Sequence, residues 1–439
     1  MQPFDVIVPQ IERRQQLKPD EKVYKYGHIC GKSCIPNILT SFYASDLVSS
    51  IIVISLQVKN SAMHFANLII VGMSTATGAF PAHTDQGLRS SRNYQVVAEK
   101  ALDQLQTWYN NDTGLWKSYA PSWWQSANQL TTLLDMTLLG SQEATAIADI
   151  VVSNTFSLAA DKYNDGDGTP FENNWYDDEG WWAIVWIRAY EATGSRVYID
   201  AAEGLFHDMT TGWGTNCSSQ GLWWNKQHTK FIAIANTLFI QVAAELANKV
   251  SDSSKKEYYR EWAITAWTFF QGSGMYSREE HLALGGINLT TCQAPPDAHG
   301  YTYENGALVA GLVKLTAATG NQTFVDEAHL IASAVMRNMT KDGVLQEQHI
   351  IQATPGESAP QFKGVFMRGL KTLHEGSPRV EYPEFARKCA ESILDKDMSD
   401  DGALGPDWNG PFYGPANASP HSSAMDALVA AWAMAGNTG

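Results

Sequence analysis

The chain carries little charge, and very little of it is positive. Charged residues make up 18% of its 439 residues, and 31 lysines and arginines stand against 46 aspartates and glutamates, for a net charge of −15. In globular proteins, charged residues usually make up about a quarter of the chain. Nucleic acids and anionic membranes require a basic face, so this composition argues against both as partners. A neutral polymer fits the composition better.

The sequence also lacks the residue patterns of several kinds of catalytic site. No cysteine pair has a convincing zinc-ligand spacing, and no two histidines form a His-x3-His or similar ligand pair. The Gly-x-Ser-x-Gly turn of many serine hydrolases is absent as well. We therefore expect no metal, no cofactor and no serine-based acyl transfer.

No apolar run is long enough to cross a membrane as a helix. The run at residues 47–58 has twelve residues, whereas a spanning helix needs about 20. Residues 63–82 combine a short apolar core with small residues near Ala79 and Ala82, which is the layout of a secretory signal. We expect residues 1–62 to be a gene-model extension or disordered, and residues 63–82 to be a signal peptide. The protein is then a secreted monomer without stable membrane insertion.

Cysteine is scarce, with five residues in the chain. Cys217 and Cys292 lie in loops rich in Gly, Ser and Thr, whereas Cys389 falls on a helical pattern as a small core residue. We expect a disulfide between Cys217 and Cys292. Six N-x-[ST] acceptors suit a surface processed in the secretory pathway. We expect glycosylation at these positions, which are Asn111, Asn216, Asn288, Asn321, Asn338 and Asn417.

Helical periodicity is what the sequence has in abundance. From about residue 90 apolar residues recur at i, i+3 and i+4, with almost no sustained alternation, so no strand is predicted. Residues 192–202 are similar to residues 318–328, and in each segment a Thr-Gly step closes one helix shortly before the next begins. Such a repeat in a helical chain indicates stacked helical hairpins.

The periodicity predicts twelve helices in two alternating sets. One set is amphipathic with charged faces, at about residues 92–108, 141–161, 196–210, 254–271, 322–339 and 383–396. The other set is rich in Ala, Gly and Leu, at about residues 124–139, 178–192, 229–248, 304–318, 363–374 and 421–435. Small residues let the second set pack closely as an inner ring, so we predict an all-α (α/α)6 barrel at residues 85–439. The alternative is an open α-solenoid that serves as a protein-binding scaffold.

The start of one predicted inner helix points to chemistry. Trp175 and Tyr176 precede Asp177 and Asp178, and Trp181 follows within one turn. Aromatic side chains stack on the apolar faces of pyranose rings, while one carboxyl attacks or stabilises the anomeric carbon and the other handles the proton. The competing interpretation is that the two aspartates merely cap the helix.

Several stretches that begin or precede inner helices are similar to one known family. They are residues 123–130, 175–182, 212–215, 223–226, 362–368 and 422–430, and the most specific is Tyr-Asp-Asp-x-x-Trp-Trp at 176–182. Together they resemble fungal glycoside hydrolase family 76, the endo-α-1,6-mannanases and their cell-wall relatives. The resemblance implies an (α/α)6 barrel and retaining chemistry, with Asp177 as nucleophile and Asp178 as general acid/base. The chain departs from the family at Glu304, where a carboxylate replaces an expected asparagine and puts subsite contacts in doubt.

The chemistry of the pair is compatible with that implication. Consecutive positions at a helix start place their carboxyls a few ångströms apart, near the roughly 5–5.5 Å of retaining enzymes. Burial against Trp181 and Trp182 should raise the pKa of Asp178, while the helix N-terminus favours the anionic form of Asp177.

Aromatic and polar residues around the inner-helix starts are the candidate sugar contacts. They are Trp123, Trp124, Gln125, Trp175, Tyr176, Trp181, Trp223, Trp224, Lys226, Tyr303, Asn305, Phe362 and Lys363. Core packing competes with sugar stacking for the aromatic residues, and a solvated surface role competes for the lysines. We expect a retaining endo-α-1,6-mannosidase that acts on mannan polysaccharide or mannoprotein glycans. The alternatives are a cell-wall glycan transglycosylase that uses the same covalent intermediate, and a non-catalytic mannan-binding protein.

Overall fold

The computed structural model describes most of the chain after residue 92. The described residues are 93–118, 123–160, 170–296, 298–347 and 358–435. The expected signal peptide at residues 63–82 and the extension before it lie outside them. Within the described ranges, no helix is both long and apolar enough to cross a membrane.

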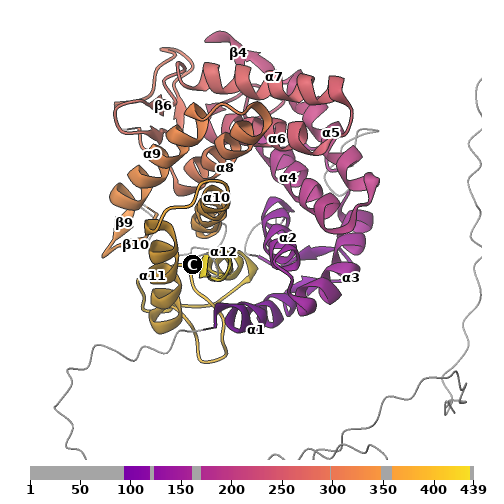
Figure 1. Ribbon diagram of the computed structural model, residues 1–439, viewed down its shortest axis with the longest axis vertical. Helices are drawn as coiled ribbons and strands as arrows, with labels where there is room; N and C mark the ends of the chain where they lie inside the picture. Colours follow the sequence, from indigo (N-terminus) through magenta and orange to yellow (C-terminus); the bar gives the residue numbers. More distant parts are fainter. Residues whose placement is uncertain (1–92, 119–122, 161–169, 297, 348–357, 436–439) are drawn as a thin grey trace, which may run out of the picture. The chain divides into compact units, whose positions relative to one another are not determined.

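The described residues form twelve α-helices that alternate between an outer and an inner ring (Figure 1). The outer helices are α1 (Tyr94–Gln106), α3 (Gln142–Ala159), α5 (Arg196–Thr211), α7 (Ser253–Phe270), α9 (Thr323–Asn338) and α11 (Glu381–Lys396). The inner helices are α2 (Trp123–Leu138), α4 (Tyr176–Thr193), α6 (Ala233–Lys249), α8 (Thr302–Thr319), α10 (Phe362–Gly376) and α12 (Ala418–Ala435). A short 3-10 turn, η1 (Ala359–Gln361), precedes α10. The two alternating sets predicted from periodicity are confirmed.

The inner helices form a closed ring. Each inner helix packs against the next one in chain order, and α12 packs against α2. The outer helices cover them, with α1 and α11 on α12, α3 on α2, α5 on α4, α7 on α6 and α9 on α8. Figure 1 shows this ring with the outer helices around it. The closure makes the fold an (α/α)6 barrel and excludes the open solenoid.

Glycine lets neighbouring inner helices approach one another closely. A Cβ on Gly306 of α8 would lie 2.5 Å from the Cα of Phe366 in α10. A Cβ on Gly180 of α4 would lie 2.9 Å from the Cβ of Leu238 in α6. Carbon atoms in contact prefer about 3.5–4.0 Å, so a side chain at either position would push the helices apart. Each contact joins early residues of two helices, so the inner helices run parallel and their N-termini share one face.

Local sequence signals account for where several helices begin and end. Ser141 and Asp252 cap α3 and α7, because each side chain accepts a hydrogen bond from a backbone N–H of the first turn. The two Thr-Gly repeats end α4 and α8. Gly194 and Gly320 adopt φ values of 70° and 75°, the left-handed conformation that glycine tolerates best. The repeated sequence is therefore a repeated helix end.

A cluster of aromatic side chains fills the space between the two rings beside α4. Trp182 and Trp186 of α4 are fully buried and stack with centroids 5.6 Å apart. Trp186 also stacks on Tyr198 of α5 at 5.5 Å, and Phe171 packs on Trp182 at 4.5 Å. Close packing of this kind fixes the rotation of a helix about its axis. It therefore fixes the direction in which the first turn of α4 presents its side chains.

Short strands in the loops are a difference from the sequence analysis, which predicts none. Five antiparallel pairs form within the described residues: β1 (Tyr109–Asn110) with β2 (Leu115–Trp116), β3 (Trp213–Thr215) with β4 (Ser218–Leu222), β5 (Phe231–Ile232) with β8 (Gly286–Ile287), β6 (Tyr276–Ser277) with β7 (Leu282–Ala283), and β9 (Thr340–Lys341) with β10 (Val344–Leu345). Nine of the ten strands have two or three residues, too few for an alternating pattern to be visible.

One disulfide joins two of these loops. Cys217, in the turn between β3 and β4, is bonded to Cys292 after β8, with the two Cα atoms 5.4 Å apart. Cys389 is a free cysteine buried in α11. The structure thus contains the bridge that the sequence analysis expects.

Candidate active site

Four aromatic side chains from four inner helices meet at the N-terminal end of the ring. They are Trp124 of α2, Trp181 of α4, Tyr303 of α8 and Phe362 of α10, and we call them the aromatic rim. Their centroids are separated in turn by 6.0, 6.3, 3.7 and 6.4 Å, the last distance returning from Phe362 to Trp124. Residues that lie far apart in the sequence therefore form a closed circle of packed aromatic rings. Trp181 and Phe362 are 4% and 8% exposed, and Phe362 stacks on Tyr303, so the stacking of sugar rings on this circle stays a prediction.

The two adjacent aspartates lie in the first turn of α4. The N-cap position belongs to Trp175, whose side chain makes no capping hydrogen bond. Oδ2 of Asp177 accepts a hydrogen bond from Nε1 of Trp224 at 3.0 Å. Oδ2 of Asp178 accepts one from Nδ2 of Asn173 at 2.8 Å. Because neither aspartate is the N-cap and each is held by a side chain outside the helix, capping alone does not explain the pair.

The loop after β4 brings Trp224 to the pair. Asn225 forms an isolated antiparallel bridge with Trp175, and the N–H of Tyr176 donates to the carbonyl of Trp224 at 3.0 Å. Nζ of Lys230 lies 4.8 Å from the centroid of the Trp224 ring. Backbone pairing and a cation–π contact thus hold the indole with its N–H directed at the first carboxylate.

Burial and neighbouring groups affect the two carboxyls differently. Burial raises the pKa of Asp177 to about 6, and the hydrogen bond from Trp224 opposes the rise. For Asp178, burial and repulsion from Asp177 raise the pKa well above its ordinary range, against the hydrogen bond from Asn173. Asp177 is therefore ionised more readily and Asp178 holds its proton more firmly. Pairs of this kind divide between a nucleophile and a proton donor.

A third carboxylate, Glu179, lies buried directly after the pair. Nζ of Lys226 is 3.2 Å from Oε1 of Glu179 and 2.7 Å from Oδ2 of Asp208 in α5. Burial and then repulsion from Asp208 raise the pKa of Glu179 well above its ordinary value, while Lys226 lowers it. The Lys226 ammonium is thus engaged by two carboxylates of the protein. These contacts give Lys226 a structural role, and its role as a sugar contact stays a prediction.

The unexpected carboxylate of Glu304 caps its own helix. It is buried, and its Oε2 accepts hydrogen bonds from the backbone N–H groups of Tyr301 at 3.1 Å and Gly285 at 3.2 Å. Burial raises the pKa of Glu304 to about 8. The departure from the family pattern therefore adds a group that supports the start of α8.

Two further predicted polar contacts are buried and bonded within the protein. Asn305 is fully buried, its Oδ1 accepts from the N–H of Ala283 at 2.9 Å, and its Nδ2 donates to a backbone carbonyl at 2.9 Å. Lys363 is 4% exposed, its Nζ donates to the carbonyl of Pro406 at 2.5 Å and lies 4.9 Å from the Trp408 ring. Buried polar groups find partners within the protein, and these two have done so.

Four more predicted sugar contacts belong to the core. Nε1 of Trp123 donates to the carbonyl of Ala159 at 3.3 Å, and Trp223 stacks on His228 with centroids 4.8 Å apart. Trp123 and Trp124 are neighbours in α2 and point about 100° apart, so when Trp124 faces the site Trp123 faces inward. The exposed fractions are 3% for Trp123, 2% for Gln125, 3% for Tyr176 and 2% for Trp223. Trp175, by contrast, is 39% exposed beside the pair.

Around the site the fold brings together residues that no single sequence pattern connects, among them Arg368 from the stretch 362–368 that resembles the family. Asn173 stands just before the pair, and nothing in its spacing marks it. Further inside the ring, Nη1 of Arg368 in α10 is 3.0 Å from Oδ2 of Asp426 in α12. Oγ1 of Thr132 in α2 donates to Oδ1 of the same aspartate at 2.7 Å. These contacts join three inner helices, and only a folded ring brings their members together.

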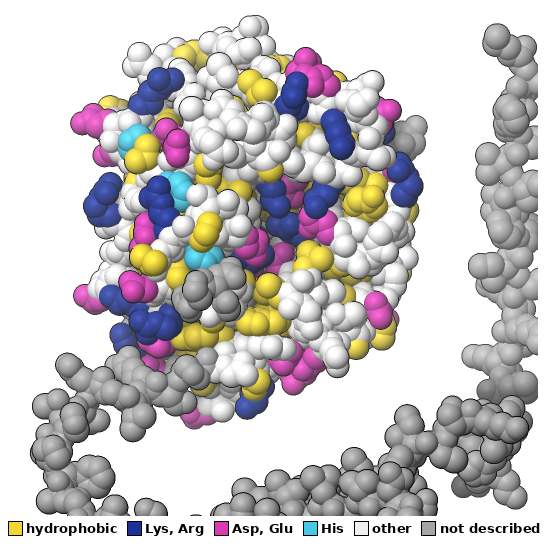
Figure 2. Space-filling view, viewed as in Figure 1, with side chains coloured by type: hydrophobic (Ala, Val, Ile, Leu, Met, Phe, Trp, Pro, Cys, Tyr) yellow, Lys and Arg dark blue, Asp and Glu magenta, His cyan; other side chains and the backbone are white. Residues whose placement is uncertain are grey.

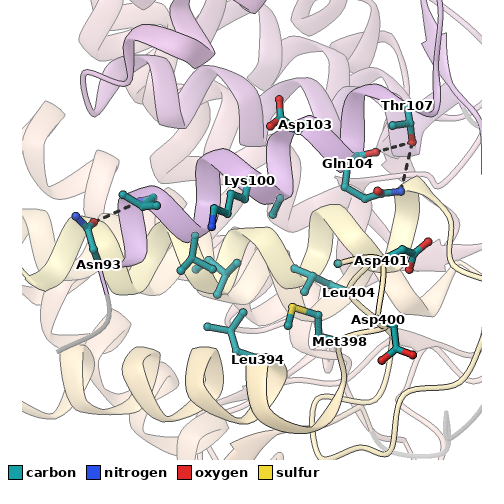
Figure 3. A pocket seen from close by; sticks show the side chains of 15 residues that line it. Asn93, Lys100, Asp103, Gln104, Thr107, Leu394, Met398, Asp400, Asp401 and Leu404 are labelled. Carbon is teal, nitrogen blue, oxygen red and sulfur yellow. Dashed lines mark hydrogen bonds between the residues drawn. The ribbon is translucent and has the colours of Figure 1, made fainter. Parts of the chain in front are cut away.

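Two cavities in the described part of the structure lie away from Asp177 and Asp178. One, of about 850 Å³, lies between α1, the end of α11 and the residues after it, and Lys100, Leu394 and Met398 line it (Figure 3). The other, of about 570 Å³, has Arg188 and Lys371 among its lining residues, and Figure 2 shows basic and acidic side chains together near the centre of the ring. Neither cavity is lined by the aspartate pair or the aromatic rim. The site is therefore assigned by its chemistry and not by cavity size.

The six predicted glycosylation sites differ in exposure. Asn417, at the start of α12, is 6% exposed, and its Oδ1 accepts a hydrogen bond from the N–H of Ser419 at 3.0 Å. A glycan needs an accessible amide nitrogen, so the prediction for Asn417 is corrected. The other five positions are exposed and remain predictions: Asn111, Asn216, Asn288, Asn321 and Asn338.

The described barrel matches a known family along its length. The family model of glycosyl hydrolase family 76 matches residues 93–437. A protein of Schizosaccharomyces pombe with the provisional name mannan endo-1,6-alpha-mannosidase is 22% identical over 259 residues. That match spans 55% of this chain and 57% of the length of the relative.

Solved structures share the fold at low sequence identity. One is an inactive variant of an α-1,6-mannanase of Salegentibacter sp. HEL1_6, with two consecutive aspartates replaced by asparagine, in complex with α-1,6-mannotriose. It has a TM-score of 0.66 and 22% identity, over 77% of this chain and 99% of that chain. Dfg5 from Chaetomium thermophilum, in complex with glucosamine, has a TM-score of 0.67 and 17% identity, over 80% and 93% of the two chains. At such identities the likeness concerns the fold, and the all-α (α/α)6 barrel is confirmed.

Proposed function

The chain belongs to glycosyl hydrolase family 76, and from this we propose that it hydrolyses α-1,6-mannosidic linkages within mannan or mannoprotein glycans, with retention of configuration. The observation that carries the proposal is the arrangement of Asp177 and Asp178. They are adjacent half-buried carboxyls, held by different donors and shifted in pKa by different causes. Family membership supports a glycosidase, and the pair supports this mechanism.

Relatives support the choice of substrate and of residues. The Salegentibacter enzyme is an α-1,6-mannanase, and a variant that has lost two consecutive aspartates is inactive. The described part of this chain contains two such pairs, Asp177–Asp178 and Asp400–Asp401. The second pair is exposed in the loop after α11, whereas the first is half-buried with Trp224 beside it. The first pair is therefore our choice.

The first half-reaction forms a covalent intermediate. The ionised Asp177 attacks the anomeric carbon of a mannosyl unit as the glycosidic carbon–oxygen bond breaks. Asp178 gives its proton to the departing oxygen, so the remainder of the glycan leaves as a neutral hydroxyl. The mannosyl unit stays bound as an ester of Asp177.

The second half-reaction releases the sugar. Esterification removes the negative charge of Asp177, and with it the repulsion that raises the pKa of Asp178. Asp178 can therefore act as a base, taking a proton from water while the water oxygen attacks the anomeric carbon. The ester bond breaks, Asp177 regains its charge, and two inversions give net retention.

Linear α-1,6-manno-oligosaccharides, followed by product mass and by the anomeric configuration of the first product, test the proposal. Shortened products that keep the α configuration support it. Elongated products would contradict hydrolysis and favour the alternative function, a transglycosylase that uses the same covalent intermediate. Binding without turnover would leave the non-catalytic mannan-binding protein.

We also propose that the protein is secreted and glycosylated. Its disulfide between Cys217 and Cys292 is of a kind that persists in oxidising compartments. N-terminal sequencing of secreted protein should begin near residue 82, after the expected signal at residues 63–82. A peptide from residues 1–62 in that material would contradict the proposal.

A further inference from the structure

Asn173 is held at three points beside the proposed acid/base. Its Nδ2 donates to Oδ2 of Asp178 at 2.8 Å, and its Oδ1 accepts from the N–H of Trp175 at 2.8 Å. Its own backbone N–H donates to Oε1 of Glu179 at 3.1 Å. Asn173 is 7% exposed, so water does not compete freely for these contacts.

These contacts fix which end of the amide faces Asp178. An asparagine side chain has an acceptor oxygen at one end and a donor NH2 at the other. The backbone N–H of Trp175 can only donate, so it requires the oxygen of Asn173 on its side. The NH2 group is then left to face Asp178. A fixed donor favours the ionised form of a carboxyl, because that form accepts the hydrogen bond best.

The support behind Asn173 extends to the outer ring. Glu179, which accepts from the backbone of Asn173, is itself held by Nζ of Lys226 at 3.2 Å. Lys226 also binds Asp208 of α5 at 2.7 Å. The chain of contacts therefore runs from an outer helix through a partly exposed ion pair to the carboxyl that moves the proton.

We propose that Asn173 is a positioning residue for Asp178, presenting a fixed N–H donor that favours the ionised carboxyl and so assists the second half-reaction. The effect of Asn173 on catalysis rests on the proposed function, whereas its contact with Asp178 can be measured whether or not that function is correct. Asn173 touches no reacting atom of the substrate in this account and acts only through Asp178. Glu179 and Lys226 hold it in place.

A titration of Asp178 tests the contact directly. The protein is expressed with aspartate labelled with 13C at the side-chain carboxyl carbon and is then purified. The NMR signal of Asp178 is assigned by its absence in Asp178→Asn and is followed as the pH changes. Asn173→Ala should raise the pKa of Asp178 by about one unit or more, the range for losing a hydrogen bond to a charged group. Asn174→Ala is the matched control, because its side chain binds Gln227 at 3.1 Å and not the pair. An unchanged Asp178 pKa in Asn173→Ala would overturn the proposal.

Kinetics with an aryl α-mannoside that has a good leaving group test the consequence. Such a donor needs no proton for the first half-reaction, so the second limits turnover. Asn173→Ala should lower steady-state turnover at neutral pH by about tenfold. It should also move the ascending limb of the profile of turnover against pH to higher pH. Azide, which needs no base, should restore turnover. Loss that azide does not restore, with an unshifted limb, would reduce Asn173 to a folding role.

The support from Glu179 gives a second, graded comparison. Glu179→Gln keeps an oxygen that accepts from the backbone of Asn173, whereas Glu179→Ala removes it. The pH limb of Glu179→Gln should stay nearer to that of the wild type than the limb of Glu179→Ala, with circular dichroism verifying that both fold. Equal positions of the ascending limb in Glu179→Gln and Glu179→Ala would overturn the supporting role of Glu179. A wild type that turns over no α-mannoside would defeat the proposed function, while the titration would still decide the role of Asn173.

Discussion

Nε1 of Trp224 donates a hydrogen bond to Oδ2 of Asp177 at 3.0 Å, although the two residues are 47 positions apart in the chain. The contact places a neutral donor against a carboxyl whose pKa burial raises. A donor that cannot itself lose a proton near neutral pH stabilises the carboxylate. Trp224 therefore keeps the proposed nucleophile ionised at a position that would otherwise favour its protonation.

Replacing Trp224 with phenylalanine should make Asp177 harder to ionise. A hydrogen bond to a charged group contributes about 1.5–3 kcal/mol, which corresponds to roughly 1–2 pKa units. We expect the acidic limb of kcat/KM to move to higher pH by about one unit and the rate below that limb to fall about tenfold. A pH–rate profile checks this. A uniform loss at every pH, with the limb in place, would assign Trp224 to packing alone.

The wild-type enzyme should itself have an acidic limb near pH 6. Asp177 attacks only when ionised, and burial raises its pKa to about 6, so kcat/KM should decline as the pH falls through that value. An activated aryl α-mannoside is the suitable donor, because its cleavage does not depend on the proton of Asp178. A limb near 3.9, the ordinary pKa of aspartate, would contradict the burial of the nucleophile.

Removing the charge of Asp178 should stabilise the fold while it cripples the enzyme. The folded-state pKa of Asp178 is raised above the unfolded value of about 4. Between these two pKa values the native state binds more protons than the unfolded state, so the fold loses stability as the pH rises above about 4. Asp178→Asn should melt about 2 °C or more above the wild type at neutral pH. At a pH below about 4 the difference should shrink. A lower melting temperature at neutral pH would count against the buried like-charge pair.

Glu304 should make stability depend on pH in the same direction. Its folded-state pKa is about 8, above the ordinary 4.3, so its ionisation destabilises the fold as the pH rises between those values. Glu304→Gln keeps an oxygen that accepts from the backbone of Tyr301 and Gly285. The variant should therefore gain stability over the wild type at about pH 8 and little at pH 4. Thermal unfolding at the two pH values checks this, and an equal shift at both would contradict it.

The closeness of the inner helices can be tested at a glycine. Gly306→Ala places a Cβ 2.5 Å from the Cα of Phe366, a backbone atom that cannot move alone. Overpacking of this kind costs about 1–3 kcal/mol. Gly272→Ala is the control, because its nearest neighbour would be 3.7 Å away. Denaturant unfolding should show the loss for Gly306→Ala only, and equal stability of the two variants would contradict the close approach.

The ring could be predicted from the sequence because its causes are local. Ala- and Gly-rich helices alternate with amphipathic ones, and the Thr-Gly steps before Ser195 and Asn321 end their helices in the same way. The aspartate pair could be found because aromatic residues surround it within one turn of sequence. In both cases neighbours along the chain carry the information.

Side-chain partners that arrive from other segments could not be predicted. Lys226 and Lys363 look like free cations in the sequence, yet a carboxylate of α5 and the carbonyl of Pro406 engage them in the fold. Which of Trp123 and Trp124 faces the site depends on the rotation of α2, and packing sets that rotation. Asn173 has no pattern at all, and only its three contacts reveal it.

The most direct test of the account is to isolate the covalent intermediate. Asp178→Asn is mixed with an activated aryl α-mannoside, digested and analysed by peptide mass spectrometry. We predict one mannosyl unit on the peptide that contains Asp177, because the first half-reaction no longer needs a proton donor and the second lacks its base. Azide should release that unit as the α-mannosyl azide. A labelled peptide without Asp177, or azide rescue of Asp177→Asn with inverted product, would contradict the assignment of the pair.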